Sequence, residues 1–478
     1  MADPHDLGDM DPEAFRRAAH RVADWIADYF TDPAKYPVLA QVQPGDIAGA
    51  LPDRAPSQGE PFDRIFDDFE RIVLPGITHW NHPGFFAYFA ISGSAPGVLA
   101  EFLAAALNVQ AMLWRTSPAA TELEAITLGW LRRLLGLPDV FEGVIYDTAS
   151  ISTLHALAAA REAAVAGVRA EGLVARPDLP RLRVYCSDQA HSSIDKAVIL
   201  LGLGHASLRR VASDDQYRLI PAALERAIAQ DRADGWRPLA VVATVGTTST
   251  TSVDPIPEVA AICQREALWL HVDAAYAGVA AMVPGLEGIL RGVESADSVV
   301  VNPHKWLFTP FDLSVLYCRH MDLLRAAFAL TPDYLATTDA ATVRNLMDTG
   351  IQLGRRFRAL KLWMVLRHFG ADGIRARLSE HMRLARLFAT WVDASERFER
   401  AAPVPFSVVC FRAKGGDALN ERLLDAVNRT GEIFISHTRL DGAYTLRLAI
   451  GNLHTRERHV ARAWELLNSL AVELATSS

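Results

Sequence analysis

The strongest indication of this chain's fold class is the stretch Ser298-Val299-Val300-Val301-Asn302-Pro303-His304-Lys305-Trp306. Its first four residues are small or β-branched, and they predict a short strand that is buried on both faces. The strand leads directly into a histidine and a lysine, and open α/β sheets bind their ligands at the carboxyl ends of their strands. A lysine in this position can condense with a carbonyl cofactor, while the neighbouring imidazole can transfer protons. The stretch therefore indicates an α/β protein with a reactive amine at the edge of its sheet.

A second stretch, His271-Val272-Asp273-Ala274-Ala275-Tyr276-Ala277-Gly278, places a carboxylate at the end of another apolar segment. Asp273 lies 32 residues before Lys305 (305 − 273). A carboxylate and a lysine together are typical of a site for pyridoxal 5′-phosphate (PLP), because the acid pairs with the pyridinium nitrogen and the lysine with the aldehyde. A buried aspartate after a strand can also cap a helix, so Asp273 alone leaves both roles open.

The composition indicates a large folded protein. The chain has 478 residues, which predicts two or three domains of about 150 residues each. Hydrophobic residues make up 50% and charged residues 22%, and this permits a large packed core. The net charge is −8, so no basic excess points to nucleic acid or to an anionic membrane. We expect neither as a partner.

The cysteines and the termini bear on the compartment. Four cysteines are widely spaced, and no pair has the spacing of metal ligands, which predicts reduced thiols and no metal site. The first residues are acidic, unlike a secretory signal. The most apolar long window, 95–113, contains Glu101, Asn108 and Gln110, and is typical of a buried helix rather than a membrane span. We therefore expect a cytoplasmic protein.

The sequence divides into three segments that differ in their pattern of apolar residues. Residues 1–91 form an expected N-terminal helical segment whose apolar stripe must cover another surface, such as a second subunit. In residues 92–372, the expected cofactor-binding domain, short apolar runs alternate with alanine-rich stretches, which predicts a mostly parallel sheet between helices. Residues 373–478 predict a small α+β domain. The expected strands are Gly143–Tyr146, Leu182–Cys186, Leu239–Thr244, Leu268–Val272, Ser298–Val301 and Ser314–Cys318 in the large domain, and Ser407–Phe411, Ile433–His437 and Tyr444–Ile450 in the small one.

Three further strand ends carry residues that suit this cofactor. Ala149 and Ser150 follow the first expected strand and can begin a helix whose amides bind a phosphate. His191 follows the second strand and can stack on a flat ring, and Thr248 follows the third and can bond to a cofactor oxygen. Each of them can equally be an ordinary cap, turn or structural residue. Because these ends converge with the acid and the lysine at one edge of the sheet, a binding site is favoured.

Six runs of the sequence, in this order, carry a family resemblance. They are His82-Pro83-Gly84-Phe85-Phe86-Ala87-Tyr88-Phe89, Ser117-Pro118-Ala119-Ala120-Thr121-Glu122-Leu123-Glu124, Ser187-Asp188-Gln189-Ala190-His191-Ser192-Ser193, Val272-Asp273-Ala274-Ala275-Tyr276-Ala277-Gly278, Asn302-Pro303-His304-Lys305-Trp306 and Leu353-Gly354-Arg355-Arg356-Phe357-Arg358. The chain resembles the group II, PLP-dependent amino-acid decarboxylases, and within them the aromatic-L-amino-acid decarboxylases, over nearly its whole length. The resemblance implies the α/β fold type I of PLP-dependent transferases and a homodimer with its active site at the interface.

The resemblance also implies roles for individual residues. Lys305 is expected to form the covalent link to the cofactor aldehyde, Asp273 to pair with the pyridine nitrogen, and His191 to stack on the ring. Tyr334 matches the catalytic tyrosine of a mobile loop, which we expect to close over the substrate as a lid between about residues 330 and 350. The expected contacts to the phosphate and to the other cofactor oxygens are Ala149, Ser150, Thr248, Asn302 and His304.

The substrate wall and the phosphate turn depart from the family pattern. Ile91, Gln110 and Met112 stand near positions that often differ in the animal enzymes, and Tyr88 belongs to an aromatic cluster that can form either a substrate pocket or core. Arg355 can orient the substrate carboxylate or form an ion pair at the surface or at an interface. At the phosphate turn the chain has Tyr146-Asp147-Thr148 where the family usually has small residues. A carboxylate at Asp147 would repel a phosphate unless it points away.

The expected reaction is α-decarboxylation of an L-amino acid, with an aromatic one (Trp, Tyr, Phe or DOPA) as the leading substrate class, to an amine and CO2. Tyr334, directly or through His191, is expected to return a proton to Cα. In related aldehyde synthases the resemblance leads us to expect Phe at the first position or Asn at the second, so this chain favours the amine product. A non-aromatic substrate, an aminotransferase of the same fold and a catalytically idle scaffold are the alternatives.

Overall fold

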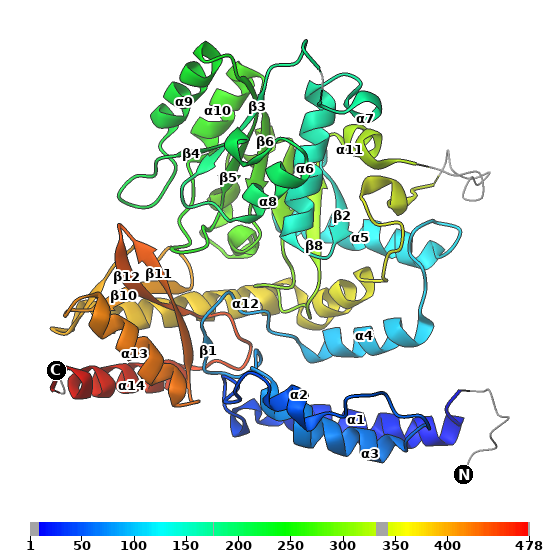
Figure 1. Cartoon of the computed structure of the whole chain (residues 1–478), viewed down its shortest axis with the longest axis vertical. Coiled ribbons are helices and arrows are strands. Elements are labelled where there is room, and N and C mark those ends of the chain that lie inside the picture. Colours follow the sequence, from blue (N-terminus) through cyan, green and yellow to red (C-terminus); the bar gives the residue numbers. More distant parts are fainter. Residues whose placement is uncertain (1–8, 175, 331–342, 477–478) are drawn as a thin grey trace.

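The computed structural model describes residues 9–174, 176–330 and 343–476 (Figure 1). Its large sheet has seven strands in the order β2-β8-β7-β6-β5-β3-β4. In this sheet β8 runs against β2 and β7, and the other neighbouring pairs are parallel. The strands are β2 (Glu142–Tyr146), β3 (Leu182–Ser187), β4 (Leu208–Val211), β5 (Arg237–Thr244), β6 (Trp269–Asp273), β7 (Ser298–Val301) and β8 (Ser314–Cys318). The five strands that precede the predicted site residues therefore end at the same edge of the sheet.

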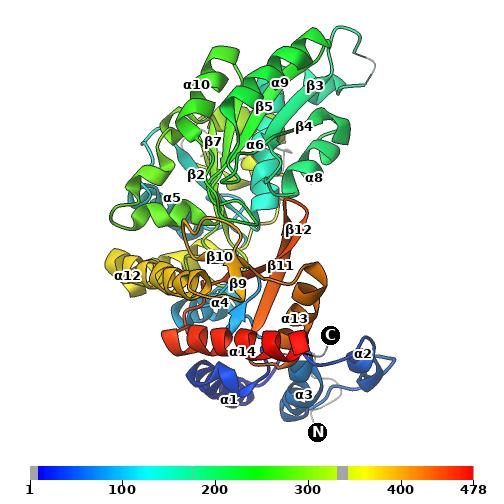
Figure 2. The ribbon, with the colours of Figure 1, turned by 90° about the vertical axis from the view of Figure 1, so that its left-hand side faces the viewer.

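Helices bury this sheet on both faces, as the side view in Figure 2 shows. Apolar side chains of α5, α9 and α10 pack on one face, and those of α6, α8 and α11 pack on the other. Strand β7 is buried along its whole length, as its continuous apolar run predicts. The helices are α5 (Pro118–Leu134), α6 (Ala149–Ala164), α8 (Ser193–Leu200), α9 (Pro221–Ala233), α10 (Ile256–Glu266) and α11 (Met321–Phe328), with the short α7 (Val168–Glu171) after α6. The α/β class expected from the sequence is confirmed.

A second sheet of five strands, in the order β1-β11-β12-β10-β9, forms the C-terminal part of the molecule. It packs against α13, α14 and the second half of α12. Strand β1 comes from the N-terminal segment and pairs in parallel with β11, so this segment is not entirely helical. The elements are β1 (Phe85–Phe86), β9 (Phe398–Arg400), β10 (Val408–Ala413), β11 (Phe434–Leu440), β12 (Ala443–Ala449), α12 (Ala359–Asp393), α13 (Asp417–Arg429) and α14 (Glu457–Thr476).

The long helix α12 crosses the expected boundary between the large and the small domain. Its backbone is interrupted at Gly370, where φ is 62° and ψ is 169°. A positive φ is cheap only for glycine, so the helix bends here, close to the expected boundary at residue 372. Residues of α12 up to Met382 contact the core of the large domain, and those from Leu384 onward contact the core of the small one.

The N-terminal helices lie along one side of the molecule (Figure 1). Helix α1 (Pro12–Thr31) begins as the sequence predicts, because the Asp11 carboxylate accepts hydrogen bonds from the amides of Glu13 and Ala14 at 3.0 and 2.9 Å. Arg21 joins α1 to α3 (Phe62–Asp68) through ion pairs with Asp63 and Asp67. The remaining elements are α2 (Asp46–Ala50), α4 (Ala95–Leu107) and the short turns η1 (Pro33–Lys35), η2 (Phe69–Val73), η3 (Leu74–Gly76), η4 (His205–Ser207), η5 (Ala277–Met282), η6 (Glu287–Leu290), η7 (Val293–Ser295) and η9 (Leu346–Thr349).

Strand β4 is the one member of the large sheet that the sequence did not predict. It is an edge strand, and its run Leu208-Arg209-Arg210-Val211 carries two arginines that ion-pair with Asp231 and Asp195. Edge strands tolerate charged side chains, which hides them from a search for apolar runs. No helix among the described residues is both long enough and apolar enough to cross a membrane.

Candidate active site

The carboxyl edge of the large sheet encloses a cavity of about 190 Å³. It lies where β2, β3, β5, β6 and β7 end and their following loops begin. All eight residues that the sequence marked as candidate cofactor contacts line this cavity; they are Lys305, Asp273, His191, Ala149, Ser150, Thr248, Asn302 and His304. The structure therefore brings these residues together, because parallel strands carry their loops to one edge.

Lys305 and Asp273 provide an amine and a carboxylate in the same cavity. Burial lowers the pKa of the Lys305 ammonium, and the negative charge of Asp273 opposes this shift. The lysine nitrogen lies 5.3 Å from the centre of the Phe89 ring. The Asp273 side chain is buried, and its Oδ1 accepts a hydrogen bond from the Ala275 amide at 3.1 Å. The carboxylate is thus held in a fixed direction, and the amine is brought closer to its reactive neutral form.

His191 lies at the mouth of the cavity with its ring partly open to solvent. Its Nδ1 accepts a hydrogen bond from the Ser193 amide at 3.1 Å, so the proton of the neutral ring sits on Nε2. The atoms packed around the ring lower its pKa, while Asp273 raises it and Lys305 lowers it further. The imidazole is therefore neutral near pH 7 and can donate through Nε2.

The wall formed by β2, α6 and the end of β7 is suited to an anion. Helix α6 begins at Ala149, so the first-turn amides and the positive end of the helix dipole lie at the cavity. His304 accepts a hydrogen bond at Nδ1 from the Leu313 amide at 2.8 Å, which leaves the proton on Nε2. Burial lowers the pKa of His304 to about 3, so the ring donates a hydrogen bond as a neutral group.

Two buried polar atoms in this cavity have no hydrogen-bond partner within the described part of the chain. They are Oδ1 of Asn302 and Oγ1 of Thr244, which end β7 and β5. An unpaired buried polar group is costly, so a polar ligand at this edge would stabilise both. The Asn302 amide can present either its oxygen or its nitrogen to such a ligand. The donor set fits PLP, with a carboxylate and a lysine on one side and helix amides, an imidazole and an amide on the other.

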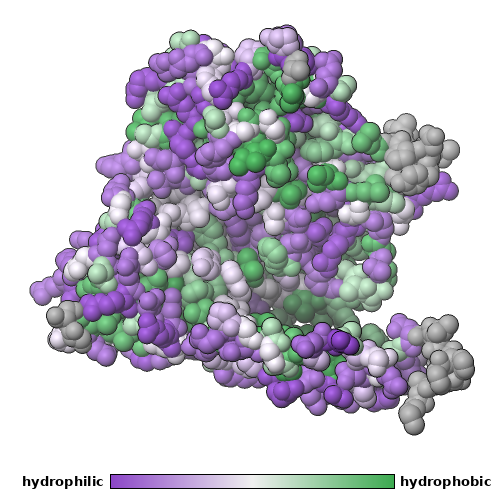
Figure 3. Space-filling view, in the orientation of Figure 1, coloured by the Kyte–Doolittle hydropathy of each residue, from purple (hydrophilic) through white to green (hydrophobic). Residues whose placement is uncertain are grey.

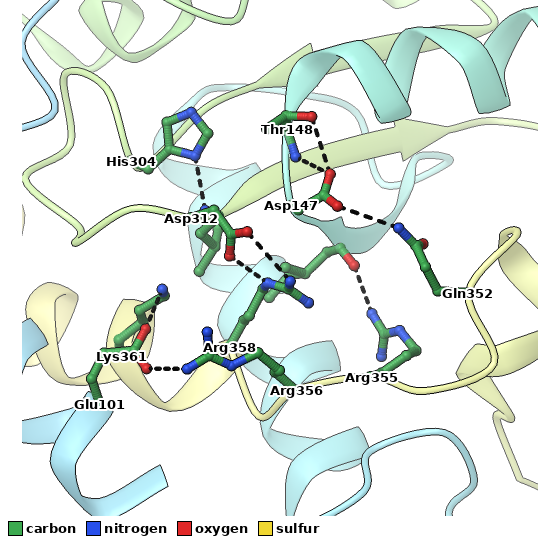
Figure 4. Close-up of polar contacts among 12 residues, drawn as sticks. Glu101, Asp147, Thr148, His304, Asp312, Gln352, Arg355, Arg356, Arg358 and Lys361 are labelled. Atoms are coloured by element: carbon green, nitrogen blue, oxygen red, sulfur yellow. Dashed lines mark hydrogen bonds and ion pairs between the residues drawn. The ribbon is translucent and has the colours of Figure 1, made fainter. Parts of the chain in front are cut away.

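Asp147 points away from this cavity. Its Oδ1 accepts hydrogen bonds from the amide and hydroxyl groups of Thr148, and its Oδ2 accepts one from Nε2 of Gln352 at 3.3 Å (Figure 4). The carboxylate is therefore directed toward the 346–358 segment. This orientation is the arrangement under which the sequence allows a carboxylate beside the phosphate turn.

The C-terminal sheet holds the loop that carries Thr248. Arg447, on β12, donates to the carbonyl oxygens of Thr248 and Ser249 at 2.8 and 2.9 Å. The sequence reasoning did not find Arg447, nor the stacked pair Phe89 and Tyr276, whose ring centres are 3.7 Å apart. Tyr276 stands in a quoted motif, but nothing in its sequence position indicates which ring it meets.

The candidate substrate residues lie outside this cavity in the single chain. None of Tyr88, Ile91, Gln110, Met112 and Arg355 is among its described lining residues. Half of the Tyr88 side chain is exposed, and its ring contacts Trp80. The Gln110 side-chain oxygen accepts a hydrogen bond from the Arg355 amide at 2.6 Å, and Met112 packs beside Met347.

Arg355 is buried and occupied by other partners. Its two terminal nitrogens lie 3.2 and 3.0 Å from the two carboxylate oxygens of Glu124, and one of them also donates to the Ile145 carbonyl at 2.7 Å. This geometry favours an ion pair over contact with the substrate carboxylate, and the pair is buried within the chain rather than at the surface or an interface.

Tyr334 and most of the expected lid lie outside the described residues. The described end of that segment is packed: Leu346, Met347 and Thr349 are buried, and the Tyr146 hydroxyl donates to the Thr349 carbonyl. Residues 346–349 therefore form a fixed anchor on β2 rather than part of a moving lid.

Comparison with known proteins identifies the family. The model of the pyridoxal-dependent decarboxylase conserved domain matches residues 44–414. Tryptophan decarboxylase 2 of Oryza sativa subsp. japonica is 42% identical over 98% of this chain and 96% of its own length. Phenylacetaldehyde synthase of Arabidopsis thaliana is 41% identical over 97% of each chain. The solved structure of Oryza sativa TDC with PLP and tryptamine superposes with a TM-score of 0.94 at 37% identity, covering 98% of this chain and 99% of the other.

These likenesses agree with the geometry of the cavity. The fold is that of the PLP-dependent enzymes of fold type I, and the cofactor is PLP, for which the cavity offers a matching set of donors. The chain therefore belongs to the pyridoxal-dependent decarboxylases, as a group II amino-acid decarboxylase of the aromatic-L-amino-acid decarboxylase family.

Proposed function

We propose that this enzyme removes the α-carboxylate of an aromatic L-amino acid and releases the corresponding amine and CO2. The observation that carries the proposal is the cavity in which Lys305, Asp273 and His191 meet at the carboxyl edge of the sheet. Relatives named for tryptophan and tyrosine decarboxylation support the aromatic class.

Lys305 holds the cofactor before substrate arrives and is the amine that releases the product. Its lowered pKa makes the neutral, nucleophilic form easier to reach inside the cavity. Phe89 covers the lysine on one side and excludes water from it. When bound, PLP supplies an electron sink for the pair of electrons left behind as CO2 departs.

Asp273 keeps a proton on the ring nitrogen of the cofactor. One carboxylate oxygen is held by the Ala275 amide, so the acid is fixed in direction and its negative charge favours a cationic partner. Ala149, Ser150, Asn302 and His304 hold the phosphate, and Thr248 contributes a hydroxyl group to the remaining edge. These roles are those that the family resemblance implies, and the presence of each residue on the cavity wall supports them.

His191 covers the open face of the cofactor and can carry a proton at Nε2 to the substrate carbon. The neutral ring would give up this proton only while it receives another, so that the step ends with a neutral imidazole. Tyr334 is the proposed source of that second proton or, alternatively, the direct proton donor to the substrate carbon.

An aldehyde product is the alternative, because phenylacetaldehyde synthase is among the proteins to which this chain is similar. Tyr334 and His191 favour the amine, because the family resemblance associates aldehyde formation with Phe or Asn at these positions. A non-aromatic substrate is a second alternative.

One experiment tests these proposals together. Purified protein with PLP is incubated separately with L-Trp, L-Tyr, L-Phe, L-DOPA and L-Glu, and amine, CO2 and hydrogen peroxide are measured in the same samples. We expect equal amounts of amine and CO2 from an aromatic substrate and no peroxide. Lys305→Ala should abolish turnover, whereas Lys414→Ala, which changes an exposed lysine in the small domain, should leave it unchanged. Peroxide in amounts equal to CO2 would reassign the enzyme to the aldehyde synthases, and turnover of L-Glu alone would overturn the aromatic class.

The working unit that we propose is a homodimer with the active site at its interface. Apolar side chains are exposed along α4 and are visible as a hydrophobic area in Figure 3. Leu99, Phe102, Leu103 and Leu107 are 58, 51, 49 and 62% exposed. An exposed apolar helix face of this size is typical of a subunit contact. A second subunit would also bring candidate substrate residues such as Ile91 and Met112 to a cavity that they do not reach within their own chain.

Light scattering of purified protein tests the dimer. We expect the mass of two chains for the unchanged protein and that of one chain for Phe102→Glu. Ile199→Glu places the same charge on α8 at a residue of similar exposure, 53%, and should remain dimeric. A monomeric unchanged protein with full activity would overturn the proposal.

The domain division and the compartment are part of the same proposal. The segments 1–91, 92–372 and 373–478 are proposed as N-terminal segment, cofactor-binding domain and small domain, with β1 joining the first to the last. All four cysteines are buried free thiols, which supports a reducing compartment such as the cytoplasm.

A further inference from the structure

A second cavity, of about 600 Å³, lies between the start of α4, the middle of α12 and the loop 453–456. It is separate from the cofactor cavity and shares no lining residue with it among the described residues. Its polar wall is formed by Ser94, His368, Arg377, Glu380, His454 and Arg456. The proposed decarboxylation uses none of these residues.

Two arginines on this wall have no carboxylate partner in the described structure. Arg377 is held by stacking over Phe369 at 4.3 Å and by a hydrogen bond from Nη1 to the Gly373 carbonyl at 2.7 Å. Arg456 uses its own Nη1 to donate to the carbonyls of Leu453 and Thr455, both at 2.8 Å. In both side chains the backbone bonds fix the guanidinium through one nitrogen and leave Nη2 and Nε for a ligand.

The two guanidinium groups lie close enough to repel each other. Burial and the positive charge of Arg456 lower the pKa of Arg377. Glu380, on the same wall, accepts hydrogen bonds from Arg383 at 2.7 and 2.8 Å, and the positive charge of Arg456 also lowers its pKa. Arg383 in turn pairs with Glu457, so these two carboxylates stand beside the three arginines Arg377, Arg383 and Arg456, and the positive charge that is left would be offset by an anion.

The start of α4 adds two further features that favour an anion. Ser94 is the N-terminal cap residue of this 13-residue helix, so the positive end of the helix dipole faces the cavity wall. The Ser94 side chain is 2% exposed, and its hydroxyl neither caps the helix nor has another hydrogen-bond partner within the described chain. A buried hydroxyl without a partner is costly and is stabilised when a ligand accepts its proton.

We propose that this cavity binds a small phosphate-class dianion. Two forked guanidinium groups, a hydroxyl group and a helix N-terminus line the same cavity, and this set of several donors matches a tetrahedral oxyanion better than a flat carboxylate. The site is distinct from the place where the cofactor phosphate binds at α6. His381 also lines this cavity, and its Nδ1 accepts a hydrogen bond from the Trp306 indole at 3.0 Å, so Trp306 fluorescence can report on binding.

The test is calorimetric titration of PLP-saturated protein with inorganic phosphate at constant ionic strength. PLP occupies the α6 site, so the heat reports a second phosphate site. We expect one phosphate per chain, and affinity about tenfold weaker in Arg456→Gln and in Arg377→Gln, because each loses a charge-assisted hydrogen bond. Ser94→Ala should weaken binding by a smaller factor. Arg367→Gln is the matched control, since Arg367 lies on the same helix but stacks on Trp363 outside the cavity, and it should bind as the unchanged protein does.

Three results are decisive. Phosphate binding that Arg456→Gln and Arg377→Gln weaken and Arg367→Gln preserves, with acetate failing to compete, supports the site. Equal affinity in all variants, or no binding heat and no change in tryptophan fluorescence, overturns it. Acetate that binds as well as phosphate overturns the dianion and leaves a general carboxylate site instead. Each variant is first checked for its bound PLP absorbance, so that a failure of the fold or of the cofactor site is recognised separately.

Discussion

Replacing Arg355 by methionine should destabilise the protein without changing how substrate binds. Arg355 and Glu124 are 9 and 2% exposed and form a two-pronged ion pair inside the large domain. They also hold Ile145 on both sides, since the Ile145 amide donates to Glu124 and its carbonyl accepts from Arg355. Arg355→Met leaves the buried Glu124 carboxylate without its paired guanidinium, with Arg344 as the nearby positive charge, and a buried carbonyl without this donor.

The size of the effect follows from the desolvation of the abandoned charge. Removing one partner of a buried ion pair costs about 3–5 kcal/mol. The entropy of unfolding for a chain of this length is about 1 kcal/mol/K, so Tm should fall by about 3–5 °C if the chain unfolds as one unit. The double variant Glu124→Leu/Arg355→Met removes both charges, and we expect it to recover at least about half of this loss.

The assay is thermal unfolding at fixed protein and PLP concentrations, since both shift the apparent Tm. KM is measured for the same variants. If Arg355 instead oriented the substrate carboxylate, Arg355→Met would raise KM strongly, keep its Tm within about 1 °C, and gain nothing from the change at Glu124. That combination of results would refute the reasoning.

Three further predictions concern the cofactor wall, the packing of α4 and the response to pH. Asp147→Asn keeps the hydrogen bond to Thr148 but removes a negative charge near the phosphate turn. We therefore expect PLP to bind about two- to tenfold more tightly in fluorescence titrations of apoprotein. Asp139→Asn, at an exposed position, should leave the affinity for PLP unchanged. Gly97→Ala places a Cβ against the Pro310 ring and should lower stability by about 1–3 kcal/mol. A Cβ added at Gly129 has its nearest neighbouring atom at 3.9 Å, so Gly129→Ala should be neutral or stabilising by up to about 1 kcal/mol. Thermal unfolding compares the two variants. Burial lowers the pKa of His271 and His381 from 6.5 to about 4, so the unfolded chain binds more protons than the folded one between these values. Their contribution to stability is complete above about pH 6.5 and is lost as the pH falls toward 4, so Tm should be flat above about pH 6.5 and fall between that pH and about 4; a Tm that rises toward pH 4 would contradict the argument.

The sequence alone was enough to predict the cofactor site, because the residues that carry its chemistry lie at the ends of strands. Lys305 and Asp273 each follow a short apolar run, and a mostly parallel sheet carries all such ends to one edge whatever the details of packing. The order of strands and helices follows from the same local signals. Three edge strands escaped them: the residues of β4 do not form an apolar run, and β1 and β9 have only two and three residues.

The tertiary structure alone decided which partners the polar side chains meet. Asp147 turns toward Gln352, which is 205 residues further along the chain, and Arg355 reaches Glu124 across 231 residues. Arg447 supports the Thr248 loop from another sheet. No pattern of neighbouring residues encodes such pairings, because a charged side chain takes whichever partner the packed core places beside it, and a buried charge is tolerated only where that partner is found.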